Sequence, residues 1–141
     1  MVTDKICEIA FTNKYSSKRK SRSAFRQSAD RKAKAFEKTE MHDVYTVSHD
    51  KVKLHGRLFS VANPKRIVLA LHGYKSSAAF DFAFIHDMLC QLDCMVLYAD
   101  MRAHGESEGE FIGLGVLERY DVRAWLDFIH ENRLDNLPVY M

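Results

Sequence analysis

Residues 66–75, Arg-Ile-Val-Leu-Ala-Leu-His-Gly-Tyr-Lys, decide how the rest of the chain is interpreted. Residues 67–71 form an unbroken aliphatic run, which is typical of a strand buried on both faces of a parallel sheet. The run ends at His72-Gly73, and a helical pattern follows over residues 78–92. Ligands bind in open α/β sheets where a buried strand gives way to such a turn and helix. Backbone N–H groups point out of the turn, and the start of the helix favours negative charge.

The rest of the chain extends this pattern on both sides. Alternating polarity predicts an antiparallel hairpin over residues 43–62, and a second apolar run predicts a buried parallel strand over 95–99. A helix is predicted over 116–131 and a last strand over 137–141. Asp121 is expected on the outer side of that helix.

The totals favour one cytoplasmic globular domain. The chain has 141 residues, of which 47% are hydrophobic and 28% charged, and its net charge is +2. Three cysteines are too few for a secreted disulfide framework and favour a reducing compartment. No apolar run approaches the roughly 20 residues that span a bilayer. We therefore expect a cytoplasmic protein without a membrane partner.

The N-terminal part differs in charge from the remainder. Residues 1–40 hold 11 Lys/Arg against 5 Asp/Glu, whereas residues 41–141 hold 10 against 14. We interpret 1–40 as a basic, partly helical segment, with Ser28 as a possible helix cap, and 41–141 as the folded domain. The basic stretch over 14–26 could contact a polyanion, but a solvated segment packed loosely on the domain is favoured, and no nucleic-acid partner is expected.

Three motifs follow one another along the chain: His-Gly-Tyr at 72–74, Asp-Met-Arg-Ala-His-Gly-Glu-Ser at 100–107, and Gly-Leu-Gly-Val-Leu-Glu-Arg-Tyr-Asp at 113–121. Together they resemble the front half of an α/β-hydrolase. More narrowly, they resemble bacterial serine hydrolases of the esterase, acyl-transferase and aminopeptidase-like branch, over roughly residues 44–141. Ala103 stands where the pattern has glycine.

The resemblance implies an incomplete α/β-hydrolase fold: an antiparallel hairpin followed by parallel strands with flanking helices. It implies that the backbone N–H of Tyr74 is one donor of the oxyanion hole, with Gly73 and His72 shaping the turn. In the family the nucleophilic serine follows the fifth strand, which here is expected at 137–141. We therefore expect the serine, acid and histidine base to be missing from this chain, which would be an inactive fragment of a hydrolase for a small acyl substrate. No cofactor is expected, and the oligomeric state is left open.

Two other motifs compete with this interpretation. Residues 105–109 satisfy Gly-x-Ser-x-Gly, but a spacer separates them from the strand and carboxylates flank Ser107, so a nucleophile is disfavoured. Residues 73–76, Gly-Tyr-Lys-Ser, resemble the end of a phosphate-binding loop, yet the earlier glycine of that motif is missing. A non-catalytic binding or regulatory module with a basic arm is the alternative function.

Metal sites are disfavoured at two groups of candidate ligands. The first group, His42, His49 and His55, lacks paired spacing and is expected at the surface near a sheet edge. In the second group, His86, Cys90 and Cys94 recur at four-residue steps, but buried thiols beside a partly exposed histidine are the favoured interpretation.

Overall fold

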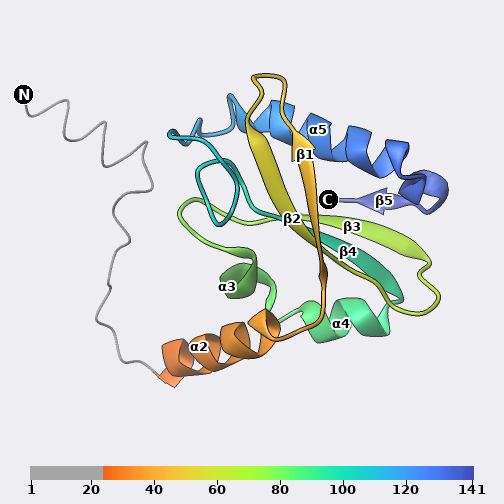
Figure 1. The fold of residues 1–141 in the computed structure, drawn as a ribbon. Helices are drawn as coiled ribbons and strands as arrows, with labels where there is room; N and C mark the ends of the chain where they lie inside the picture. Colours follow the sequence, from red (N-terminus) through yellow and green to blue (C-terminus); the bar gives the residue numbers. More distant parts are fainter. Residues whose placement is uncertain (1–23) are drawn as a thin grey trace, which may run out of the picture.

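The fold is built on a five-stranded mixed sheet (Figure 1), in a computed structural model that describes residues 24–141. The sheet has the order β1-β2-β4-β3-β5. β1 and β2 are antiparallel, β2 is antiparallel to β4, and β3 is parallel to both β4 and β5. The strands are β1 (His42–Val47), β2 (Lys53–Phe59), β3 (Arg66–Leu71), β4 (Cys94–Ala99) and β5 (Val139–Tyr140). The predicted fold class is confirmed.

The two central strands present apolar side chains to both faces of the sheet, as their sequences predict. On β4, Val96 and Tyr98 face one side while Leu97 and Ala99 face the other, and all four are buried. Such two-sided burial is characteristic of parallel strands covered by helices on both faces.

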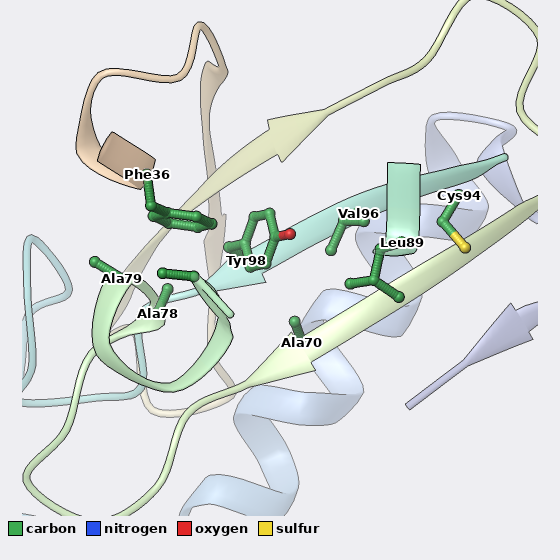
Figure 2. Packing of buried hydrophobic residues seen from close by; sticks show 9 residues of the cluster. Phe36, Ala70, Ala78, Ala79, Leu89, Cys94, Val96 and Tyr98 are labelled. Carbon is green, nitrogen blue, oxygen red and sulfur yellow. The ribbon is translucent and has the colours of Figure 1, made fainter. Parts of the chain in front are cut away.

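Of the helices within residues 24–141, three cover one face of the sheet. They are α2 (Ala24–Glu37), α3 (Ala78–Phe82) and α4 (His86–Gln91). Phe36 of α2 packs edge-on against the Tyr98 ring with their centroids 4.9 Å apart, and Leu89 of α4 joins the same cluster (Figure 2). Helix α2 therefore contributes to the core through Phe36 and Ala33, while the predicted domain boundary near residue 40 stays a prediction.

Helix α5 (Glu118–Glu131) covers the opposite face and is followed by the short 3₁₀ helix η1 (Leu134–Asn136). Trp125 and Ile129 are both 1% exposed and pack with Leu54 and Leu97. A Cβ added to Gly56 would lie 2.9 Å from the Trp125 ring, so this position in β2 requires glycine.

The structure corrects two expectations about helices. The segment predicted as one helix over 78–92 is split into α3 and α4, although neither proline nor glycine lies at the break. The break lets both helices bury small or apolar residues against α2 and the sheet. Sequence periodicity does not reveal such a break, because it depends on packing against distant elements. Helix α2 begins at Ala24, so Ser28 lies inside the helix and is not its cap. Most of the basic stretch over 14–26 lies outside the described residues.

Strand β5 lies beside β3, with Val139 opposite Ile67 and Tyr140 opposite Val68. Among the described strands, β3 is its only neighbour, and Tyr140 and Met141 are exposed. The last strand is thus shorter than predicted and forms an open edge of the described sheet. None of the helices in the described part is long and apolar enough to cross a membrane.

Candidate active site

The candidate site lies at the carboxyl ends of β3 and β4. Because these strands are parallel neighbours, the turn over residues 72–77 and the loop over 100–109 leave the sheet at the same edge. The turn opens into α3, where the side chain of the N-cap residue Ser77 accepts the N–H of Phe80. The three residues predicted to form half an oxyanion hole, His72, Gly73 and Tyr74, therefore stand at the sheet edge where ligands bind in such folds.

The turn is held by hydrogen bonds to its own backbone amides. The N–H of Gly73 donates to Asp81 Oδ2 at 2.7 Å, and the same carboxylate accepts the Ser76 hydroxyl. The N–H of Lys75 donates to His104 Nε2 at 3.1 Å, and that of Ser76 donates to the carbonyl of Gly73. Lys75 has a left-handed φ of 52°, which gives the turn its sharp bend. Tyr74 lies at the tip, half exposed.

His72 and His104 join this turn to the loop after β4. Both rings are buried, and their centroids are 4.9 Å apart in an edge-on arrangement. His72 Nε2 accepts the N–H of Met101 at 3.1 Å, so its ring proton is on Nδ1, which donates to the carbonyl of Gly73. His104 has the same tautomer, since Nε2 accepts from Lys75 and Nδ1 donates to the carbonyl of Arg102. Burial lowers the pKa of His72.

His55 is buried between two carboxylates, so its expected place at the surface was wrong. Its Nδ1 lies 2.8 Å from Asp100 Oδ2, and its Nε2 lies 3.2 Å from Asp43 Oδ1. Burial opposes a positive charge on this ring, but the hydrogen bonds to Asp100 and Asp43 outweigh it, so the pKa of His55 is raised. The periodicity of β2 gave no sign of this, because Asp100 is distant in sequence and directly follows the neighbouring strand β4.

Arg102 connects three elements through a buried ion pair. Its guanidinium donates two hydrogen bonds of 2.7 Å to Asp121 of α5, and two of 3.0 and 3.2 Å to Asp50 in the β1–β2 turn. The hydrogen bonds from Arg102 lower the pKa of Asp50. Asp121 is 2% exposed, so its predicted position on the outer side of α5 was wrong. An acidic residue on the inner face is stabilised there because Arg102 neutralises it.

Ser107, in the misleading Gly-x-Ser-x-Gly match, is buried in the loop after β4. Its hydroxyl donates to the carbonyl of Asp100 at 2.7 Å and accepts the N–H of His55 at 2.9 Å. The hydroxyl is thus used to hold the loop against β2, and no imidazole within residues 24–141 forms a hydrogen bond with it. This geometry agrees with the expectation that Ser107 is not a nucleophile.

The second histidine and thiol group lies on the face of the sheet that α2, α3 and α4 cover. His86 is buried, not partly exposed as expected, because its Nδ1 lies 2.8 Å from the Tyr98 hydroxyl. Cys90 Sγ lies 3.7 Å from His86 Nε2, and burial raises the pKa of that thiol. Within the described residues, no group of three or more His, Cys, Asp or Glu side chains could hold a metal ion.

Comparison with known proteins identifies the fold. No protein-family model matches the chain, and no curated protein sequence matches it significantly. Among solved structures, the Pyrococcus furiosus esterase Pf2001 is similar at 32% identity and a TM-score of 0.61, over 66% of this chain and 37% of the esterase. The chain has the fold of part of an α/β-hydrolase.

Two further α/β-hydrolases support the fold at lower identity. XC6422 from Xanthomonas campestris, described as a serine hydrolase without a lid, is 20% identical with a TM-score of 0.57, over 67% of this chain and 46% of its own. Est1E from Butyrivibrio proteoclasticus, solved with ferulic acid bound, is 23% identical with a TM-score of 0.56, over 70% of this chain and 41% of Est1E. This chain spans less than half the length of each of the three hydrolases.

The candidate site contains residues that sequence reasoning missed. Asp81, eight residues further along the chain, accepts a hydrogen bond from the amide of Gly73. His104, in the loop after β4, accepts one from the amide of Lys75. His104 lies in a motif that carried the resemblance, so its place in the sequence was a usable signal. Asp81 had no comparable signal, because an acidic residue near the start of a helix is ordinary.

Proposed function

We propose that this chain supplies the oxyanion-hole side of an esterase-type site that transfers an acyl group from an ester, thioester or amide to water. The backbone N–H of Tyr74 is the proposed donor to the oxyanion, Gly73 allows the turn, and His72 positions it. We further propose that the reactive serine, its histidine base and the orienting acid come from outside these 141 residues. The chain alone is then inactive.

The observation that carries this proposal is the rigid turn at the end of β3. The amides on both sides of Tyr74 are engaged, that of Gly73 by Asp81 and that of Lys75 by His104. A donor fixed between two restrained neighbours is preorganised, which is the property that makes oxyanion-hole hydrogen bonds effective. The similarity to a Pyrococcus esterase at 32% identity supports the esterase branch.

A chimera tests the donor. Residues 44–141 would replace the matching part of the Pyrococcus esterase, and hydrolysis of a p-nitrophenyl ester would be measured. Tyr74→Pro removes the N–H, and we expect kcat to fall by about 10²–10³. Tyr74→Ala keeps the N–H and loses only the ring, so its kcat should stay near that of the parent chimera. Circular dichroism checks that both variants fold, and equal losses in the two variants would contradict the assignment.

Labelling with a fluorophosphonate probe tests the isolated chain. We expect no labelling, because the Ser107 hydroxyl is held by Asp100 and His55 and the proposed nucleophile lies elsewhere. Labelling that disappears in Ser107→Ala would overturn this part of the proposal.

A non-catalytic binding module with a basic arm is the alternative function. It predicts that the intact chain binds a polyanion such as heparin and that binding weakens steeply between about 50 and 200 mM salt. Fluorescence anisotropy measures this directly. We also propose a cytoplasmic location, which the free thiols of Cys90 and Cys94 support because reduced cysteines persist in that compartment.

A further inference from the structure

We propose that His72 and His104 form a proton-sensitive latch: two neutral rings hold the 73–76 turn against the loop after β4, and protonation of either ring releases it. The hydrogen-bond geometry of the two rings is sufficient to argue for the latch. Its consequence for catalysis, that acid would loosen the turn bearing the Tyr74 N–H, rests on the proposed function.

The latch is reciprocal. His72, at the end of β3, accepts a hydrogen bond from Met101 in the other loop, and His104 in that loop accepts one from Lys75 in the turn. Each Nδ1–H is anchored on its own segment, to the carbonyl of Gly73 or of Arg102. Each histidine thus accepts a backbone N–H from the other segment, and the turn and the loop are joined by two hydrogen bonds of 3.1 Å.

Both cross-links require the acceptor nitrogen to carry no proton. On protonation, Nε2 of His72 becomes a donor that faces the Met101 N–H, so a hydrogen bond is replaced by two opposed donors. The same holds for His104 against the Lys75 N–H. With their centroids 4.9 Å apart, two positive rings would also repel each other, so the first protonation disfavours the second.

The groups around His72 set the pH at which its cross-link to Met101 opens. Burial lowers the pKa of His72, with the neighbouring His104 adding to it, while Asp100 at the end of β4 and Asp81 of α3 oppose that shift. The net effect is a lowered pKa, so the His72 ring stays neutral at pH values where a histidine with the usual pKa near 6.5 is already protonated. The cross-link made by His72 is therefore closed at neutral pH and opens only in more acidic solution.

Nuclear magnetic resonance of the intact 141-residue chain tests the latch without any catalytic assay. Long-range proton–nitrogen spectra at pH 8 should show both rings neutral with the proton on Nδ1. As the pH is lowered to 5, amide protection factors corrected for intrinsic exchange should fall about tenfold at Met101 and Lys75, the effect of one lost hydrogen bond. The amide of Asp100, which donates to the carbonyl of His55, should stay protected.

Glutamine variants separate the two rings, since the glutamine side chain accepts a hydrogen bond but does not titrate. In His104→Gln, protection at Lys75 should no longer depend on pH, whereas protection at Met101 still does. His72→Gln should give the reverse, and exposed His49→Gln should change neither.

The wild-type spectra decide the matter even if both variants unfold. A ring that carries its proton on Nε2 at pH 8 would overturn the latch, and so would a pair that stays neutral until the protein unfolds in acid. Unchanged protection through titration of His72 would do the same. Because these readouts are backbone amides, they can fail while the Tyr74→Pro chimera succeeds, and the reverse.

Discussion

His55 and His86 are both buried, yet their surroundings shift their pKa values in opposite directions. His55 is flanked by Asp43 and Asp100, whose hydrogen bonds outweigh the cost of burial and raise its pKa. His86 is surrounded by aromatic rings and the Tyr98 hydroxyl, so burial dominates and its pKa is lowered. One ring is therefore stabilised as a cation and the other as a neutral group.

This contrast predicts opposite pH dependence for two glutamine variants. The stabilisation by His55 is fully present below its unfolded pKa of about 6.5 and is lost as the pH rises through its raised folded value. His55→Gln should therefore destabilise the protein more at pH 6 than at pH 9. His86 contributes most above about pH 6.5 and less in acid, so His86→Gln should cost more at pH 8 than at pH 5. Urea unfolding at each pH measures both differences, and the same sign for both variants would refute this electrostatic account.

Ala103 carries a residue-scale strain, because its φ is 59°. A left-handed backbone costs a residue with a side chain roughly 1–2 kcal/mol, whereas glycine adopts it freely but loses roughly 0.5–1 kcal/mol of chain entropy on folding. Ala103→Gly should therefore stabilise the protein by up to about 1 kcal/mol. Ala35→Gly in the exposed part of α2 is the control and should cost about 1 kcal/mol. Thermal unfolding compares the two, and a loss of stability in Ala103→Gly would contradict the strain.

At the scale of elements, Arg102 fastens the β1–β2 turn, the loop after β4 and helix α5 to one another. Arg102→Met should cost about 3–5 kcal/mol, because it leaves the Asp121 carboxylate buried without a partner. Arg123→Met, on the helix that carries Asp121, offers a matched control, since the Arg123–Asp127 pair is exposed and should be worth at most about 1 kcal/mol. Denaturant midpoints of the two variants test this, and similar losses would show that burial of the ion pair does not matter.

At the scale of the whole molecule, β5 is an open edge of the described sheet, with Val139, Tyr140 and Met141 all exposed. An apolar edge strand presents unpaired backbone groups that can pair with another chain. Tyr140→Lys should therefore reduce self-association, and sedimentation velocity would show a smaller oligomeric fraction. Met88→Lys, on the exposed side of α4, adds the same charge away from the edge and should have little effect. A larger effect of Met88→Lys would argue against association through β5.

The sequence by itself determined β3 and β4, the two faces they bury, and the turn at residues 72–77. Local patterns carry this information, because an unbroken aliphatic run with a glycine turn after it admits few other structures. The motifs around residues 72–121 also predicted the superfamily, which the comparison with solved hydrolases confirmed.

Only the tertiary structure decided where the polar groups are buried and what neutralises them. Asp121 faces inward because Arg102 meets it, and His55 is buried because strands β1 and β4 bring Asp43 and Asp100 to its two nitrogens. The pairing of His72 with His104 likewise depends on two loops that the sheet order places side by side. Periodicity reports which face of an element is polar, but the charge that makes a buried polar group stable comes from residues distant in sequence.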